Sequence, residues 1–270
     1  MSGLRATPDE LVNDAIMQWT AKMALLVVEG QTDRTVLSQL LEGDSVYVAV
    51  ASDKSNALRV VELLGDVSPA VVGPTRVLVD RDDDQGPCEE GRLIRTVGRD
   101  LDAEIAAAPD VLLRAVWQSL RCGSRAEAEA VHEKVVRAAH GLRALREVNA
   151  SRSMGWKLKS IQMKDVLRVD MKRPQEVLSV VGVDPSHPEW EDLQADVSRH
   201  LSREPAIASC QGHDLHGLVA ECKGPVSRDS VQNQCAILVL ANPSGIKTLD
   251  LVKSWISLAG LSGPASSLAA

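Results

Sequence analysis

The chain has 270 residues, of which 44% are hydrophobic and 25% charged, so it can bury a large apolar core. The formal net charge of −7 argues against attraction of the whole molecule to nucleic acid or anionic lipid, and the near absence of Tyr and Phe argues against extensive base stacking. No apolar run reaches the roughly 18 residues that a membrane-spanning helix needs. We expect a cytoplasmic protein that binds no membrane, with its five cysteines as free thiols because none forms a C-x-x-C pair.

The first hundred residues alternate strand and helix patterns. Short apolar runs predict four strands, at residues 23–28, 46–50, 76–79 and 92–97. Apolar residues at helical spacing predict helices at 36–41 and 57–64, the first of them capped by Thr32 and Asp33. This alternation predicts a parallel sheet covered by helices on both faces, with ligands at the carboxyl ends of the strands.

The second half of the chain carries helical spacing and almost no strand pattern. It predicts helices at residues 101–120, 125–148, 190–201, 213–222 and 246–258. We expect three parts: a catalytic core at 1–122, a basic and mainly helical insertion at 123–205, and C-terminal helices at 206–270 that complete the core or dock a partner. The segment 263–270 is expected to be frayed.

One segment is basic although the chain as a whole is acidic. Residues 134–173 hold eleven Lys and Arg and three acidic residues, a net charge of +8, so the rest of the chain carries −15. A basic segment beside an acidic body is what a protein that binds the phosphate backbone and a metal ion would show. The alternative is a solvated helix surface that happens to be basic.

Two acidic positions, Glu29 and Asp80, each follow an apolar strand by one residue. Because neighbouring parallel strands end at the same edge of a sheet, we expect both side chains at that edge. Carboxylates gathered in this way repel one another and have raised pKa values unless a divalent cation neutralises them. Magnesium fits best, because it prefers oxygen ligands and completes its coordination with water and substrate phosphate.

The acidic run at residues 80–84 contains a D-x-D pattern. In an extended segment Asp80 and Asp82 point to one side, and Arg81 and Asp83 point to the other, so the first pair supplies the better ligands. Asp84 either joins them as a third ligand or caps the following turn. The pattern alone is not specific, because sugar transferases and haloacid-dehalogenase-like phosphatases also end a strand with D-x-D.

The combination of E-G-Q-T-D at residues 29–33 and V-D-R-D at 79–82 resembles the TOPRIM domain. That module of topoisomerases, primases and OLD-like nucleases carries a glutamate after its first strand and D-x-D after its third. The chain looks still more like a bacterial TOPRIM family with V-E-G-x-T-D, then a Lys-Ser pair opening a helix, then V-D-R-D. The sequences T-V-G-R-D-L-D at 96–102 and G-H-D-L at 212–215 extend the resemblance over residues 24–220.

The resemblance implies a TOPRIM fold and assigns roles to the acids. Glu29 would be a metal ligand or the general acid/base, and Asp80 and Asp82 would hold Mg²⁺, with Mn²⁺ as an alternative. Asp33 would help to bind a second metal, unless it is only the N-cap of the next helix. Asp102 stands where the family carries an acid on a helix, usually the longer Glu, which leaves binding of a second metal open.

The resemblance also implicates basic residues. Lys54 would contact a phosphate from a helix N-terminus, although a solvated lysine is an equal alternative. His213 would stabilise charge that develops on phosphorus, unless it is a hydrogen-bonded structural histidine. OLD-like enzymes use a distant lysine for this purpose, and the candidates here are Lys157, Lys159 and Lys164.

The function implied is a metal-dependent endonuclease that cuts DNA or tRNA as a toxic effector of anti-phage defence. Such effectors pair with an ABC-type or AAA-type ATPase, and this chain has no G-x-x-x-x-G-K-[ST] loop, so a second subunit would supply nucleotide-driven control. Association of several copies of the chain is also expected. The alternatives are a catalytically silent TOPRIM sensor or binding subunit of such a complex, and a D-x-D phosphohydrolase.

Overall fold

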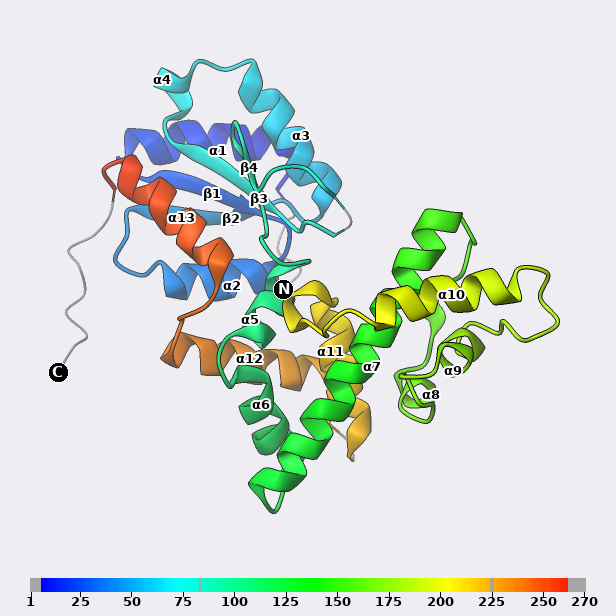
Figure 1. Cartoon of the computed structure of the whole chain (residues 1–270). Coiled ribbons are helices and arrows are strands. Elements are labelled where there is room, and N and C mark those ends of the chain that lie inside the picture. Colours follow the sequence, from blue (N-terminus) through cyan, green and yellow to red (C-terminus); the bar gives the residue numbers. More distant parts are fainter. Residues whose placement is uncertain (1–5, 83, 224–225, 262–270) are drawn as a thin grey trace. The chain divides into compact units, whose positions relative to one another are not determined.

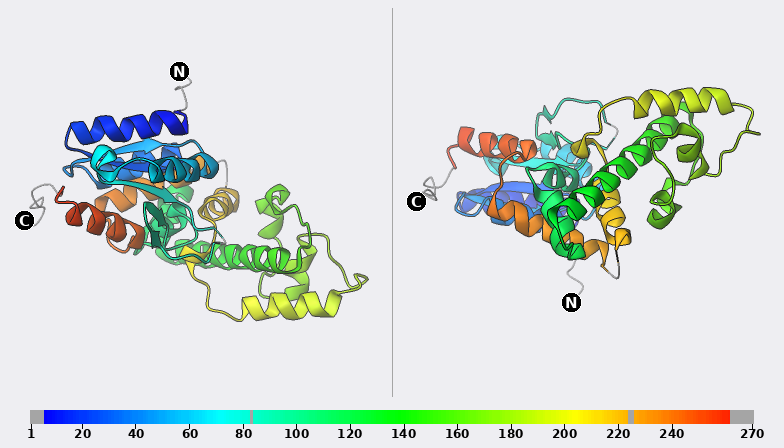
Figure 2. Two further views of the ribbon diagram at one scale, coloured as in Figure 1. Left: turned by 90° about the horizontal axis from the view of Figure 1, so that it is seen from above. Right: turned by 60° about the horizontal axis from the view of Figure 1, so that its bottom comes forward.

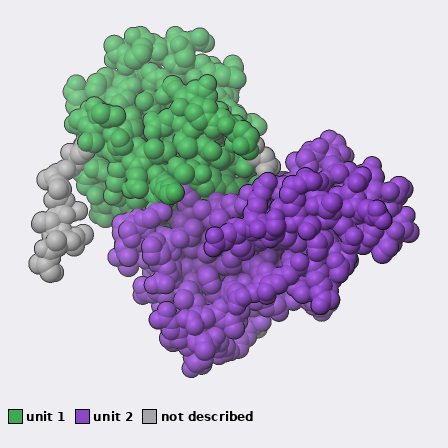
Figure 3. All heavy atoms as spheres, viewed as in Figure 1, with its two compact units in different colours: residues 1–101, 246–270 green, residues 102–245 purple. Residues whose placement is uncertain are grey.

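The computed structural model describes residues 6–82, 84–223 and 226–261 (Figure 1). The chain forms two compact units: unit 1 comprises residues 1–101 and 246–270, and unit 2 comprises residues 102–245 (Figure 3). The boundaries expected from the sequence, after residues 122 and 205, do not coincide with the limits of these units. Asp83 and the predicted frayed segment 263–270 lie outside the described residues. No helix in the described ranges is long and apolar enough to cross a membrane.

Unit 1 is built on a five-stranded sheet in the order β2-β1-β3-β5-β4. Its strands are β1 Ala24–Val28, β2 Val46–Val50, β3 Thr75–Val79, β4 Glu89–Glu90 and β5 Leu93–Arg95. All neighbours pair in parallel except β4, which is antiparallel to β5. Every residue of β1 is buried, as expected for a central strand covered on both faces. The predicted α/β class with a mostly parallel sheet is therefore confirmed.

Helices cover both faces of this sheet (Figures 1 and 2). They are α1 Pro8–Thr20, α2 Gln31–Leu40, α3 Lys54–Gly65, α4 Pro69–Val72 and α13 Lys247–Leu258. Leu25 and Val27 of β1 pack in one apolar cluster with Leu11 of α1 and Val60 of α3. Arg76 alternates to the opposite face of β3 and lies over the Trp255 ring of α13, 5.8 Å from its centroid.

The segment after residue 245 belongs to unit 1 because α13 completes its core. Val252, Trp255 and Ile256 of α13 are buried. The N–H of Val97, just after β5, donates to the hydroxyl of Thr248 at 2.8 Å. Of the two roles foreseen for the C-terminal helices, completion of the core is the one that α13 has.

Unit 2 is helical, as the periodicity predicted for the second half of the chain. Its elements are α5 Leu101–Ala107, which begins at the last residue of unit 1, α6 Val111–Leu120, α7 Arg125–Arg152, η1 Leu158–Ser160, α8 Met163–Val166, α9 Pro174–Ser179, α10 Trp190–Leu201, η2 Ile207–Ser209, α11 Gly212–Cys222 and α12 Arg228–Ala241. The single helix predicted at 101–120 is divided, because Pro109 interrupts it and Asp110 has a φ of 61°.

Candidate active site

The carboxyl ends of β1 and β3 bring Glu29 and Asp80 together. The register pairs Val28 with Leu78, so the residues after both strands emerge at the same edge of the sheet. The Glu29 carboxylate accepts a hydrogen bond from the backbone N–H of Asp80 at 2.8 Å. The prediction that these two acids meet at one strand-end edge is therefore confirmed.

Asp80 is the centre of a cluster of negative charge. Its Oδ1 accepts a hydrogen bond from the N–H of Leu101 at 3.2 Å. Burial, followed by the charges of Asp33, Asp100 and Glu29, raises the pKa of Asp80 to about 9. Asp100 was not among the predicted site residues, although it lies in the T-V-G-R-D-L-D segment that contributed to the TOPRIM resemblance.

Glu29 is subject to opposing influences. Burial raises the pKa of its carboxyl above the usual value, and the charges of Asp82 and Asp53 act in the same direction. The hydrogen bond from Asp80 and the charge of Lys54 lower it, without cancelling the effect of burial. A carboxyl with a raised pKa can take up a proton near neutral pH more readily than an ordinary surface carboxylate.

Lys54 lies within this acidic cluster. It is the first residue of α3, whose N-cap Asp53 accepts the N–H of Asn56 at 2.8 Å. The Lys54 ammonium forms an ion pair with Asp82 at 2.8 Å and donates to the backbone carbonyl of Asp80. Lys54 stands at a helix N-terminus, as predicted, and its contact with a phosphate stays a prediction.

Asp82 reaches the cluster by a different route from the predicted one. Its φ of 51° lies in the left-handed region, and its N–H donates to the carbonyl of Arg99 at 2.8 Å. The chain therefore turns at this residue, and the assumed alternation of an extended segment does not hold. Arg81 is directed elsewhere: its N–H donates to the Thr96 hydroxyl at 2.9 Å and its Nε donates to the Thr96 carbonyl at 3.0 Å.

Asp84 caps the turn that follows the cluster. Its Oδ1 accepts the N–H of Gly86 at 2.7 Å, and its Oδ2 pairs with Arg95 at 2.6 Å. Of the two roles left open for Asp84, the structure shows the turn cap. This carboxylate is held by partners outside the Glu29–Asp80 pair, which makes it a useful control position.

Asp33 has a capping role, but it is not the N-cap. The helix α2 begins at Gln31, so Gly30 takes the cap position that the sequence analysis assigned to Thr32 and Asp33. The Asp33 carboxylate accepts the N–H of Gly30 at 3.0 Å from the first turn of the helix. Its charge also raises the pKa of Asp80, so Asp33 lies near enough to contribute to the acidic cluster.

The described part of the chain contains no group of three His, Cys, Asp or Glu side chains arranged to hold a metal ion. The donor chemistry at the edge nevertheless suits magnesium, which commonly uses one or two carboxylates and fills its remaining positions with water and phosphate oxygens. Glu29 and Asp80 supply carboxylates of this kind, and burial is the main cause of the raised pKa of each, with neighbouring acidic charges adding to it.

A comparison of the chain with protein-family models and with curated proteins finds no match. The fold and the edge cluster are therefore the observations that bear on function. Asp102 and His213, which the TOPRIM resemblance also implicates, belong to unit 2.

Within unit 2, Asp102 is surrounded by groups of α11 and α12. Its Oδ2 accepts a hydrogen bond from the Gln232 side chain at 2.7 Å, and its charge acts on both His213 and His216. His216 is buried, and neither ring nitrogen has a hydrogen-bond partner among the described residues. Burial lowers the pKa of His216, and Asp102 opposes that shift. Metal binding by Asp102 and charge stabilisation by His213 stay predictions.

The aspartate of the G-H-D-L segment is structural. Asp214 is buried and forms an ion pair with both terminal nitrogens of Arg146, with Oδ1 3.0 Å from Nη2. This paired contact fastens α11 to α7 within unit 2. Packing of the helical unit therefore accounts for Asp214 without any catalytic role.

The basic segment 134–173 divides by residue type. Each of its arginines pairs with a carboxylate: Arg137 with Glu133, Arg143 with Glu147, Arg146 with Asp214, Arg152 with Asp196, Arg168 with Asp165 and Arg173 with Asp170. Its lysines are all exposed and form no ion pair within the described residues: Lys134, Lys157, Lys159, Lys164 and Lys172. The positive charge available to a ligand therefore comes mainly from the lysines. It is smaller than the net charge of the segment suggests.

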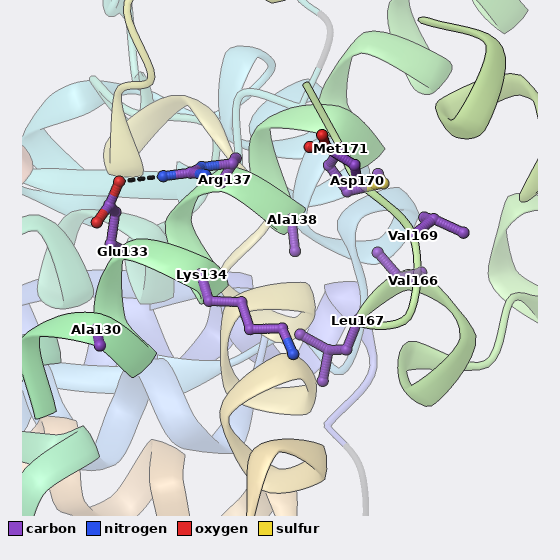
Figure 4. A pocket seen from close by; sticks show the side chains of 10 residues that line it. All are labelled: Ala130, Glu133, Lys134, Arg137, Ala138, Val166, Leu167, Val169, Asp170 and Met171. Carbon is purple, nitrogen blue, oxygen red and sulfur yellow. Dashed lines mark hydrogen bonds and ion pairs between the residues drawn. The ribbon is translucent and has the colours of Figure 1, made fainter. Parts of the chain in front are cut away.

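One of these lysines borders a hollow in unit 2. Lys134 and the Glu133–Arg137 pair of α7 line a cavity of about 300 Å³ together with apolar side chains that include Leu167 and Met171 (Figure 4). Lys157, Lys159 and Lys164, the lysines singled out from the sequence, do not line it. Lys157 lies just before η1, Lys159 lies on η1 and Lys164 lies on α8.

Proposed function

We propose that the chain is a magnesium-dependent TOPRIM endonuclease that hydrolyses phosphodiester bonds in DNA or tRNA and serves as a toxic effector of anti-phage defence. The observation that carries the proposal is the meeting of Glu29 and Asp80 at the carboxyl edge of adjacent parallel strands. A TOPRIM site requires its glutamate and its D-x-D aspartates to converge there, and two stretches of chain 51 residues apart do so.

The side chains of the cluster suit phosphodiester hydrolysis. Asp80 and Asp82 would hold Mg²⁺, which when bound polarises the scissile phosphate and lowers the pKa of a coordinated water. Glu29, whose pKa burial raises, would either add a ligand to the metal or accept the proton of the attacking water. Lys54 brings a positive charge to the same edge, where it can balance the negative charge of a bound phosphate.

The exposed lysines of unit 2 support the choice of nucleic acid as substrate. Unpaired lysines bind backbone phosphates as point charges, and this binding weakens steeply as the salt concentration rises, because the release of counterions then contributes less. A small-molecule phosphohydrolase would not need them. In the proposed system any nucleotide-driven control would come from a separate ABC-type or AAA-type ATPase, because this chain carries no phosphate-binding loop of the G-x-x-x-x-G-K-[ST] type.

Cleavage assays test the proposal directly. Plasmid DNA and total tRNA are incubated with the protein in Mg²⁺, in Mn²⁺ and in EDTA, beside Glu29→Ala and the matched control Asp84→Asn. We expect metal-dependent cleavage that Glu29→Ala abolishes and Asp84→Asn preserves, because Asp84 caps a turn. Cleavage that persists in Glu29→Ala would refute the assignment of this site.

The same preparations separate the alternatives. Turnover of a chromogenic phosphate ester without cleavage of either nucleic acid would favour a D-x-D phosphohydrolase. Thermal stabilisation by Mg²⁺ without any turnover would favour a silent binding subunit, because ligand binding raises stability whether or not chemistry follows. The stabilisation should be absent in Asp80→Asn if Asp80 is the metal ligand.

A further inference from the structure

Unit 1 contains a second polar feature at the carboxyl edge of its sheet. A cavity of about 490 Å³ is lined by residues of α1, of the start of α2 and of β2, and by Ser52, which lies two residues after β2. Its polar and aromatic lining residues are Asp14, Gln31, Arg34, Tyr47 and Ser52. This volume falls within the roughly 300–1,000 Å³ of sites that bind small molecules or nucleotides.

The cavity adjoins the acidic cluster through Glu29. Strand β1 lies between β2 and β3, and Gly30, the residue after Glu29, lines the cavity. Asp80 therefore lies on the β3 side of Glu29, and the cavity lies on its β2 side. A chain-like substrate with one phosphate at Glu29 and Asp80 would place a neighbouring nucleotide in or beside this cavity.

Two charged side chains in the cavity have no partner within the described residues. Asp14 and Arg34 both line it, yet neither forms an ion pair or a side-chain hydrogen bond there, with each other or with other groups. Burial and the charge of Glu10 raise the pKa of Asp14. Arg34 lies in the first turns of α2, where the helix dipole disfavours a cation, so a bound anion would stabilise it.

This set of groups matches a particular nucleotide. Arg34 can bind a phosphate, and the Asp14 carboxylate accepts hydrogen bonds. The half-buried Tyr47, which also packs against the apolar core, brings an aromatic side chain to the cavity wall. Guanine is the standard base that presents a ring N–H and an amino N–H side by side, which fits the two oxygens of one carboxylate. We propose that the cavity binds a guanine nucleotide adjacent to the scissile phosphate, a role that rests on the nuclease function proposed above.

Calorimetric titration of the full chain in EDTA tests the cavity without involving a metal ion. The probes are 5′-GMP and 5′-AMP. We expect GMP to bind at least about 10-fold more tightly than AMP, a discrimination typical of one paired hydrogen-bond contact. Asp14→Asn should remove the preference for GMP, and Arg34→Gln should weaken both nucleotides to a similar extent. Equal binding of the two nucleotides, or no binding of either, would overturn the proposal.

Matched controls guard against general effects of altered charge. Asp9→Asn on α1 and Arg59→Gln on α3 change exposed charges of unit 1 that do not line the cavity. Both should bind GMP as the unaltered protein does. A loss of GMP binding in these controls equal to that in the cavity variants would contradict a specific site.

Sequencing of cleavage products separates this proposal from the nuclease assignment. If Asp14→Asn loses GMP selectivity while no nucleic acid is cut by any variant, the cavity stands and the nuclease assignment fails. If the protein cuts with no guanine next to the cut, and Asp14→Asn leaves the cut pattern unchanged, the nuclease stands and the cavity proposal fails.

Discussion

The Glu29 carboxylate accepts a hydrogen bond from the backbone N–H of Asp80 at 2.8 Å, so this side chain both carries charge and fixes the start of the acidic run at residues 80–84. Glu29→Gln keeps a carbonyl oxygen for that N–H and removes the charge. We expect cleavage to fall at least about 100-fold with little change in stability. Glu29→Ala leaves the N–H without its acceptor and should lower the free energy of unfolding by about 1–3 kcal/mol. Urea unfolding and cleavage rates measure the two effects, and equal stability of both variants would contradict the structural role.

The raised pKa of Asp80 makes stability depend on pH. Its folded pKa of about 9 exceeds the ordinary value of 3.8, so between these values the folded state binds a proton that the unfolded state has released. Stability therefore falls as pH rises through this window, by up to about 1.4 kcal/mol per pH unit for one proton. In EDTA, we expect the unfolding free energy to decline between pH 5 and 8 and Asp80→Asn to show a flatter profile. Identical slopes in the two proteins would show that Asp80 is not the titrating group.

The unpaired lysines of unit 2 should govern the salt dependence of binding to nucleic acid. Replacing Lys157, Lys159 and Lys164 together by Gln should weaken binding to many sequences alike and reduce the slope of log affinity against log salt by up to about one for each phosphate that is no longer bound. The measurement is fluorescence anisotropy with a labelled duplex at several salt concentrations. The matched control replaces three exposed lysines of unit 1, Lys22, Lys247 and Lys253. An equal weakening in both triple variants would point to net charge rather than to a binding surface.

Asp214 should matter for stability rather than for chemistry. Removing one partner of its buried ion pair with Arg146 leaves a buried charge unpaired, so Asp214→Ala should lower the free energy of unfolding by about 3–5 kcal/mol. Asp165→Asn, which breaks the exposed pair with Arg168, should change it by no more than about 1 kcal/mol. Denaturant unfolding distinguishes the two cases. A stable but inactive Asp214→Ala protein would instead assign this aspartate to the site.

The sequence was most informative where apolar runs end in acids. The runs before Glu29 and Asp80 are strands that parallel pairing must bring side by side, so the meeting of the two acids followed from topology alone. Both ends of α10 and the first residue of α7 were likewise predicted to the residue. These features depend on periodicity, which is local.

Other parts depended on turns and on contacts remote in sequence. The left-handed φ of Asp82 overrides strand alternation, and neither that turn nor the approach of Asp100 to Asp80 has a periodic pattern. Helix α1 was not predicted, although Thr7 and Glu10 form a capping box at its start. Helix α12 was not predicted because a continuous apolar run over residues 235–241 hides the helical period.

The return of the chain to unit 1 at Ile246 has a consequence for biosynthesis. Everything in unit 2 emerges from the ribosome before α13, whose Trp255 covers the Arg76 side of β3. The residues of the acidic edge are therefore synthesised before α13, which covers the face of β3 that carries Arg76. A chain that stops before α13 leaves that face uncovered. Folding of unit 1 thus depends on a segment that follows the whole of unit 2 in the sequence, so unit 1 cannot complete its core until that segment has been made.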